Sequence, residues 1–246
     1  MTEGSSPSLF HHDLQIPLNR KGDDMIIRGN RESLEKKAGL LLAQTINRVL
    51  QKQSMLVLGV PGGRSVASVL RYLGAEPIEW DRVHLFMVDE RFVTLDHPDS
   101  NFTTVQDAVN PFMKKANLHP FRHDPAAAGN SIDVYRSELA RYGGRFDIVL
   151  LSSGEDAHVA SLFPQHESIL NPDESFIHTC RAPKPPPDRM SASRKLLEGA
   201  QTAVLLFLGP EKQGAFFMFS DEKKSVEQCP AKLVQEVSEC YILRGE

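Results

Sequence analysis

The sequence predicts an α/β protein with a mainly parallel, doubly wound sheet covered by helices on both faces, in three layers. Two observations predict this class. Short apolar runs typical of strands buried on both faces recur at Met55–Val60, Val83–Val88, Phe146–Leu151 and Ala203–Leu208. Segments with helical spacing alternate with these runs, which favours a parallel sheet over an antiparallel one.

Length and composition set the limits of this prediction. The chain has 246 residues, of which 41% are hydrophobic, so it can bury a sizeable core. We expect one domain over residues 1–246, with a loosely held N-terminal segment over 1–18. The net charge of -4 indicates no nucleic-acid or membrane-surface partner. Without a signal-peptide core or an apolar run of membrane-spanning length, the protein is expected to be cytoplasmic.

The cysteines and histidines show no recognised metal-binding spacing. Cys180, Cys229 and Cys240 are widely separated, odd in number and form no CxxC pair. This usage favours a reducing compartment and predicts neither a disulfide framework nor a zinc site. His119 and His123 are four residues apart, but the proline between them argues against a helical metal-binding pair.

Helices are expected between the strands, where apolar residues recur at helical spacing. The expected helices cover residues 31–52, 66–73, about 100–109, 131–142, 195–199, 210–219 and 230–237. Asn30 can cap the first of them, and Ser100 or Asp99 can cap the third. The Gly143-Gly144 pair is expected to end the fourth. Weaker strands are expected at 175–180, 189–193 and 240–243, with an irregular segment over 110–124 and a stiff proline-rich loop over 183–187.

Polar or glycine-rich segments follow four of the predicted strands. They are Pro61–Ser65, Asp89–Arg91, Gly154–His158 and Gly209–Lys212. Open α/β sheets bind their ligands at the carboxyl ends of the strands, so these segments are candidates for one site. A glycine turn before a helix is a natural anion site, whereas Asp89–Arg91 taken alone is more typical of a solvated loop.

His158 is the side chain in its loop that can both accept and donate a proton near neutral pH. A purely structural interpretation is also open, because an acid and a histidine at such a junction often only cap a helix.

Four segments in a fixed order resemble the 6-phosphogluconolactonase family, within the larger group that includes glucosamine-6-phosphate deaminases. They are VHLFMVDERFV with DHPDSN over 83–101, GEDAHVASLFP over 154–164, PPPDR over 185–189 and GPEK over 209–212. The resemblance implies hydrolysis of the δ-lactone of 6-phosphogluconolactone, with no metal or organic cofactor. It implies a phosphorylated sugar lactone as the partner, and we expect a monomer or a small homo-oligomer.

The resemblance also implies roles for individual residues. The family's catalytic histidine falls on His158, the base that activates water. Asp156 either orients that ring or caps the loop. The residues placed around the substrate are Gly62, Gly63, Arg64 and Ser65 on a phosphate-binding turn, with Asp89, Arg91, Arg189 and Lys212. Asp89 either bonds substrate hydroxyls or holds Arg91 in place, and we favour the second interpretation.

The chain departs from the family pattern at several glycine positions. The usual turn SGGSTP is replaced by PGGRSV over 61–66, and Ser152 and Ala157 stand where glycine is usual, as does Gln165. If position 157 requires a positive φ, Ala157 is strained by about 1–2 kcal/mol.

Three other functions are weighed against the lactonase. An aminosugar-phosphate deaminase of the same fold usually carries a segment such as AFNEP after its histidine, whereas this chain has ASLFP over 160–164. A non-catalytic sugar-phosphate sensor generally carries an added DNA-binding domain. A purely structural protein leaves the coincident polar loops unexplained.

Overall fold

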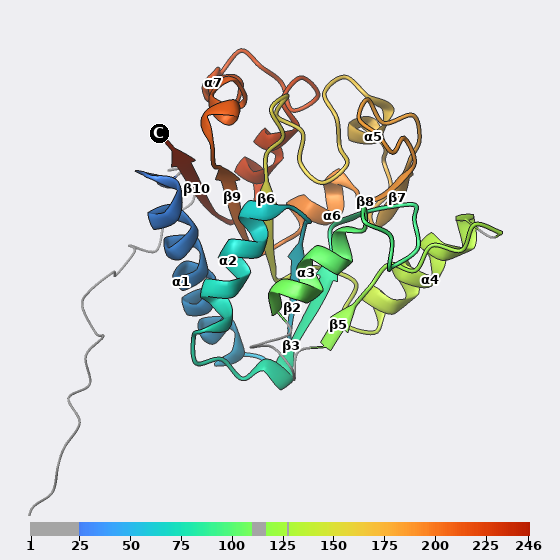
Figure 1. The fold of residues 1–246 in the computed structure, drawn as a ribbon, viewed down its shortest axis with the longest axis horizontal. Helices are drawn as coiled ribbons and strands as arrows, with labels where there is room; N and C mark the ends of the chain where they lie inside the picture. The colour runs from blue at the N-terminus through green and yellow to red at the C-terminus, as the bar shows by residue number, and fades with distance from the viewer. Residues whose placement is uncertain (1–24, 110–116, 127) are drawn as a thin grey trace, which may run out of the picture.

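The computed structural model describes residues 25–109, 117–126 and 128–246, and it confirms the predicted α/β fold class (Figure 1). The central sheet has seven strands in the order β1-β10-β9-β6-β2-β3-β5, and all of its pairings are parallel. In chain order they are β1 (Met25–Gly29), β2 (Leu56–Val60), β3 (Val83–Met87), β5 (Asn117–His119), β6 (Ile148–Ser152), β9 (Thr202–Phe207) and β10 (Glu239–Gly245). The expected loose segment over 1–18 lies outside the described residues.

The direction of the chain across the sheet reverses between β2 and β6. From β2 the chain proceeds outward through β3 to β5, while from β6 it proceeds the opposite way through β9 to β10. The carboxyl ends of β2 and β6 therefore diverge into loops on opposite sides, which is where open α/β sheets form a ligand crevice.

Helices form the outer layers. The helix α1 (Arg31–Leu50) packs against α2 (Arg64–Gly74), and α2 packs against α3 (Asn101–Val109), over the face nearer the viewer in Figure 1. The helices that follow β5, β6 and β9 lie on the other face, as right-handed crossovers returning across the sheet require. These are α4 (Ala128–Ala140), α6 (Arg194–Glu198) and the 3₁₀ helix η3 (Pro230–Glu236).

The remaining short elements surround the loops. They are α5 (Glu167–Leu170), α7 (Gln213–Ser220) and the 3₁₀ helices η1 (Trp80–Arg82) and η2 (Pro210–Lys212). No helix in the described ranges combines the length and apolar character that a membrane crossing needs.

A second sheet was not predicted. The strands β4 (Asp89–Arg91), β8 (Arg189–Ala192) and β7 (Phe176–Thr179) pair antiparallel in the order β4-β8-β7. The interpretation of Asp89–Arg91 as a solvated loop is therefore wrong. Two of its side chains, those of Asp89 and Glu90, are buried.

Buried Glu90 explains why this acidic segment is ordered. Its carboxylate accepts hydrogen bonds from the backbone N–H groups of Asn101 and Phe102, each at 2.7 Å, and from the hydroxyl of Ser100 at 3.1 Å. Glu90 thus satisfies free N–H groups at the start of α3, a role that Ser100 shares by accepting from Thr103 N–H. Burial raises the pKa of Glu90 despite these backbone donors.

Most predicted element boundaries hold within a few residues. Asn30 caps α1 by accepting from Ser33 N–H at 2.9 Å, and Gly143 and Gly144 follow α4 with positive φ. The helix expected over 210–219 is divided into η2 and α7, and the one expected over 230–237 is a 3₁₀ helix. The edge strands β1 and β5 were not predicted. Strand β5 has only three residues and lies in the segment predicted as irregular.

Candidate active site

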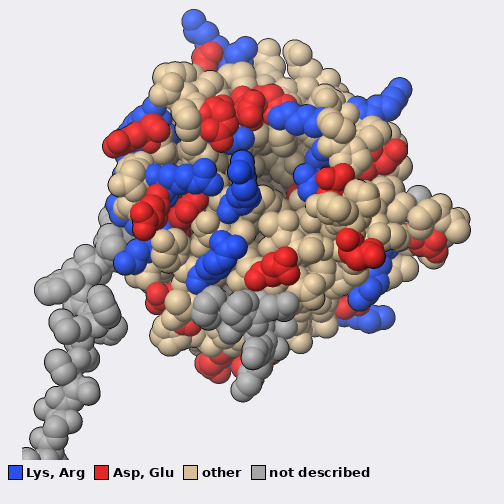
Figure 2. All heavy atoms as spheres, in the orientation of Figure 1, with Lys and Arg blue, Asp and Glu red and all other residues tan. Residues whose placement is uncertain are grey.

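A cavity of about 300 Å³ opens above the carboxyl ends of the central strands. It is lined by Pro61, Gly62, Gly63, Asp89, Arg91, Asn101, Ser152, Ser153, Gly154, His158, Ala160, Lys184, Arg189 and Lys212. On the face drawn in Figure 2, Lys and Arg side chains border a hollow in the molecule. The cavity therefore combines an imidazole with a concentration of positive charge, although the chain as a whole is acidic.

Seven of the predicted site residues line this cavity, namely Gly62, Gly63, Asp89, Arg91, His158, Arg189 and Lys212. Arg64 and Ser65 do not line it. They are the first residues of α2, where Arg64 is exposed and the Ser65 hydroxyl accepts a hydrogen bond from Arg31 Nη2 at 3.0 Å. The predicted phosphate-binding turn therefore contributes its glycines, but not these two side chains, to the cavity wall.

His158 is held by Asp156. The ring nitrogen Nδ1 lies 2.5 Å from the Asp156 carboxylate, so a neutral ring protonated at Nδ1 donates to Asp156 and keeps Nε2 as a free base. Burial alone would raise the pKa of Asp156. The hydrogen bond from His158 and the nearby Lys184 ammonium outweigh burial and hold that pKa well below its ordinary value. Asp156 is therefore an ionised carboxylate hydrogen-bonded to the imidazole of His158.

The loop backbone permits this close arrangement. Gly154 N–H donates to the His158 carbonyl at 2.8 Å, and a Cβ at Gly154 would lie 2.0 Å from His158 Nδ1. Ala157 has φ 64°, so this alanine does occupy a position that favours glycine. The same holds for Gln165, with φ 54°. The expected backbone strain at position 157 is thus present in the fold.

The glycine turn after β2 presents backbone to the cavity. A Cβ at Gly62 would lie 2.0 Å from Asn101 Oδ1, so only glycine fits there. Gly63 has φ 111°, and its missing Cβ faces open space. No side chain caps the start of α2. The first N–H groups of that helix are therefore available to an anion.

Arg91 is held by a partner that the sequence did not indicate. Its Nη1 donates to Asn101 Oδ1 at 2.5 Å and to the Asp99 carbonyl at 2.8 Å. Asp89 instead accepts from the Ser161 hydroxyl at 2.9 Å and from Asn101 Nδ2. Among the described residues no ion pair joins Asp89 to Arg91, and the two are linked instead through Asn101, which donates to Asp89 and accepts from Arg91. The buried Nε of Arg91 has no partner in the same ranges.

Arg189 supports the loop between β7 and β8. Its Nε and Nη2 donate to the carbonyls of Lys184, Pro185 and Pro186, each at 3.0 Å. Burial lowers its pKa, partly opposed by Asp89. This clamp fixes the loop that brings Lys184 to within 3.5 Å of Asp156.

Lys212 lies in η2 after β9 and faces the cavity from the opposite side of β6 to the glycine turn. Burial lowers its pKa, while the carboxylates of Glu211 and Glu155 oppose that shift. An anionic ligand would favour the charged form of this half-buried ammonium and so oppose the effect of burial.

Several lining residues were missed. These include the polar Asn101 and the charged Lys184. Pro61, Ser152, Ser153 and Ala160 also line the cavity. Asn101 lies within the quoted DHPDSN segment, so the family pattern offered a signal for it. Lys184 offered none, because a lysine in a proline-rich loop is usually a surface charge.

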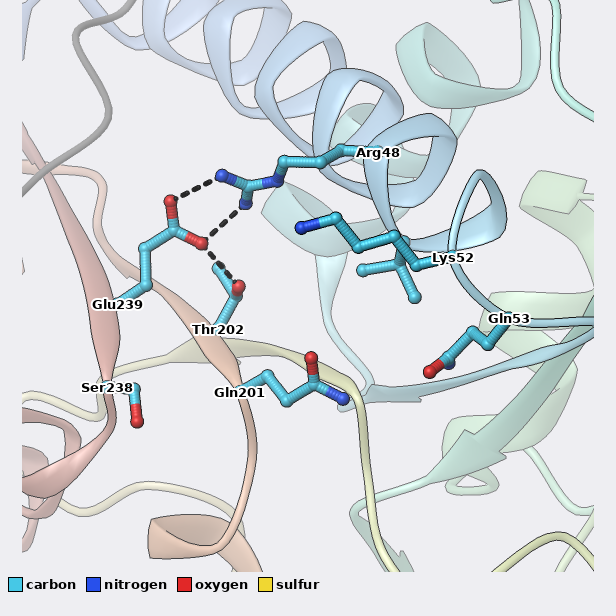
Figure 3. A pocket seen from close by; sticks show the side chains of 8 residues that line it. Arg48, Lys52, Gln53, Gln201, Thr202, Ser238 and Glu239 are labelled. Atoms are coloured by element: carbon cyan, nitrogen blue, oxygen red, sulfur yellow. Dashed lines mark hydrogen bonds and ion pairs between the residues drawn. The ribbon is translucent and has the colours of Figure 1, made fainter.

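A second cavity, of about 380 Å³, lies at the amino ends of β9 and β10 (Figure 3). Its Glu239 carboxylate accepts from both terminal nitrogens of Arg48 and from the hydroxyls of Thr202 and Tyr241, at 2.5–3.0 Å. These bonds outweigh burial and lower the pKa of Glu239. Because Arg48 and Glu239 already bind each other, we interpret this network as a structural link between α1 and the sheet.

Comparisons with known proteins agree with this architecture. A model of the family described as glucosamine-6-phosphate isomerases/6-phosphogluconolactonase matches residues 29–242. The chain is 31% identical over 203 residues to a 6-phosphogluconolactonase of Borreliella burgdorferi, covering 80% of this chain and 86% of that protein. A Synechocystis 6-phosphogluconolactonase is 28% identical over 221 residues, covering 85% of this chain and 90% of that protein.

Solved structures share the fold. A 6-phosphogluconolactonase from Shewanella baltica superposes with a TM-score of 0.81 at 20% identity, covering 93% of this chain and 100% of that one. One from Thermotoga maritima gives 0.79 at 22% identity, covering 91% of this chain and 100% of that one. At sequence identities this low, the similarity to these structures supports the shared fold and nothing more.

Proposed function

The chain belongs to the glucosamine-6-phosphate isomerase/6-phosphogluconolactonase family, and on this premise we propose that it is a 6-phosphogluconolactonase. The reaction is hydrolysis of 6-phosphogluconolactone to 6-phosphogluconate in the pentose phosphate pathway. Relatives carrying that name, which align with most of the chain, support the assignment. The observation that carries it is the Asp156-bound His158 in a cavity surrounded by cations.

The proposed reaction begins with a water molecule between His158 and the lactone carbonyl. Nε2 of His158 takes a proton from the water as the oxygen attacks the carbonyl carbon. The imidazolium that forms is stabilised by the Asp156 carboxylate. When the tetrahedral intermediate collapses, the same ring returns the proton to the departing ring oxygen. The product is the open-chain acid.

The developing negative charge on the carbonyl oxygen needs donors that are already in place. The backbone N–H groups of the Gly62-Gly63 turn are suitable, since this turn lines the same cavity as His158. No step of the proposed mechanism uses a metal ion or an organic cofactor.

The phosphate of the substrate is assigned to the positive side of the cavity. Arg91, Lys184, Arg189 and Lys212 all line it, and the uncapped start of α2 adds N–H donors. Arg189 Nη1 has no hydrogen-bond partner among the described residues, so it can donate to the substrate.

We place the enzyme in the cytoplasm. Fractionation of cells with an antibody against the chain would test that location.

The decisive measurement is hydrolysis of freshly generated 6-phosphogluconolactone, with the spontaneous rate subtracted and glucosamine 6-phosphate assayed in parallel. Acceleration of lactone hydrolysis alone is expected. Ammonia release from the amino sugar would instead place the chain in the deaminase branch. Binding of either compound without turnover would indicate a sensor.

His158→Ala tests the proposed base. We expect kcat to fall by about 10²- to 10⁴-fold, the usual contribution of general acid–base catalysis, with little change in melting temperature. His97→Gln is the matched control, since His97 is exposed and lies outside the cavity. An unchanged rate in His158→Ala would remove this residue from the mechanism.

A further inference from the structure

The hairpin formed by β7 and β8 carries three potential metal ligands on one face. In this hairpin His178 pairs with Met190 and Thr179 pairs with Arg189. Continuing the register by one pair puts Cys180 opposite Asp188. His178 is two residues from Cys180 and therefore projects on the same side. The antiparallel pairing of β7 with β8 brings the three side chains together, although they are not regularly spaced in the sequence.

The three donors are already close to one another. Cys180 Sγ lies 3.4 Å from His178 Nδ1, and His178 Nε2 lies 3.1 Å from Asp188 Oδ1. One donor atom from each residue falls within 4.8 Å of the other two. In a tetrahedral zinc site a sulfur and an imidazole nitrogen lie about 3.5 Å apart, given the usual bond lengths. The Cys180–His178 separation therefore suits a shared zinc ion without backbone movement.

The surroundings favour a cation. His178 stacks on Phe92, with ring centroids 4.5 Å apart and an angle of 10° between the planes, which fixes the imidazole. The Asp188 side chain is 53% exposed, so its carboxylate can rotate from Nε2 toward the Nδ1 side. Cys180 is the one cysteine in the described ranges that is not buried, so a solvated ion can reach it.

We propose that this hairpin face binds one Zn²⁺ through Cys180 Sγ, His178 Nδ1 and an Asp188 carboxylate oxygen, with water as the fourth ligand. The mixture of thiolate, imidazole and carboxylate is a donor set that zinc accepts. On binding, the S–H bond breaks and the proton passes to solvent while the Zn–S bond forms. The proton on Nδ1, where present, moves to Nε2 or to solvent.

This site is separate from the cavity. Arg189 alternates with Asp188 along the chain, so its side chain projects from the opposite face of the hairpin, where it lines the cavity. The proposal therefore does not depend on the lactonase assignment. It bears on the same loop, however, because a metal joining Cys180 to Asp188 would tie together the ends of the segment that carries Lys184.

The test is titration of the full, reduced chain with Co²⁺, which occupies zinc sites and absorbs light when bound. A thiolate-to-cobalt charge-transfer band is expected to saturate at one ion per chain and to disappear on addition of Zn²⁺. Cys180→Ser should abolish the band. His178→Gln and Asp188→Asn should weaken Co²⁺ binding at least about tenfold, since each removes a ligand.

Two controls exclude other sites. His97→Gln, which alters another exposed His–Asp pair, and His158→Gln, in the cavity, should leave the band unchanged. The melting temperature without metal checks that each variant folds, and Zn²⁺ should raise it in the parent chain but not in Cys180→Ser. Absence of the band in chain with a titratable free thiol, or its persistence in Cys180→Ser, would overturn the proposal.

Discussion

At the scale of single residues, the bond between Asp156 and His158 determines which nitrogen of the imidazole faces the cavity. Asp156→Asn keeps the size of the side chain but removes its charge and can present an amide N–H to Nδ1. That donor would favour the tautomer protonated at Nε2, which cannot act as a base. We expect kcat to fall by up to about 10⁴-fold, the loss that the same substitution causes in a Ser-His-Asp triad.

The pH profile separates this effect from simple misfolding. The low pKa of Asp156 keeps it ionised across the working range, where its charge favours the imidazolium. Without that charge the imidazolium loses support, so the acid limb of kcat/KM should move to lower pH. A profile of unchanged shape with a reduced maximum would show that Asp156 only caps the loop.

Backbone strain is a second effect at this scale. Gln165 is exposed and has φ 54°, a conformation that costs a non-glycine residue about 1–2 kcal/mol. Gln165→Gly should therefore raise the free energy of unfolding by up to about 1 kcal/mol, after the entropy cost of glycine is subtracted. Urea denaturation measures the change.

The matched control is Gln51→Gly at the end of α1, where φ is -69°. There glycine relieves no strain and should destabilise the chain by about 0.5–1 kcal/mol. Equal effects of the two substitutions would refute the strain interpretation.

At the scale of elements, Glu90 connects β4 to the start of α3, and through Asn101 it positions the cavity wall. Glu90→Ala leaves the buried N–H groups of Asn101 and Phe102 without their acceptor. We expect a loss of about 2–4 kcal/mol in the free energy of unfolding. KM should also rise, because Asn101 holds Arg91.

Glu174→Ala provides the comparison, since the Glu174 side chain is 82% exposed and its one ion-pair partner within the described part of the chain is Lys195. It should cost less than about 0.5 kcal/mol. If Glu90→Ala cost no more than this control, Glu90 would not act as a buried helix cap.

The elements also show where sequence reasoning succeeded. Strands such as Leu56–Val60 and Thr202–Phe207 are apolar because both faces are buried, and this leaves a continuous pattern in the sequence. The interpretation of Asp89–Arg91 as a solvated loop was wrong because a strand of three charged residues has no such apolar pattern. Its order comes from partners distant in the sequence, chiefly the N-terminus of α3.

At the scale of the whole molecule, cations gather at one cavity of a chain whose net charge is -4. Such focusing attracts an anionic substrate over roughly a Debye length, about 8–10 Å at ordinary ionic strength. We therefore expect kcat/KM for the phosphorylated lactone to fall as salt is added.

Lys184→Gln should weaken this salt dependence, whereas Lys36→Gln should not. Both remove one charge from the chain, but Lys36 is an exposed residue of α1 outside the cavity wall. Identical salt profiles for the two variants would mean that net charge, not the local cluster, matters.

The same scale sets the limit of what the sequence could reveal about the site. His158, Arg91 and Lys212 follow buried strands, so the strand pattern and the family resemblance located them. Lys184 reaches the cavity only because Arg189 clamps a loop of the second sheet, which no local pattern predicts. Arg64 and Ser65 do not line the cavity, since α2 begins directly after Gly63.

The strand order also has a consequence for synthesis on the ribosome. Among the described strands β1 is made first and β10 last, yet β10 is the only neighbour of β1 in the sheet and lies between it and β9. Throughout translation, β1 and the outer edge of β9 therefore lack their native partner. Nascent chains have two exposed strand edges until β10 emerges, and these are the surfaces that a co-translational chaperone would need to cover.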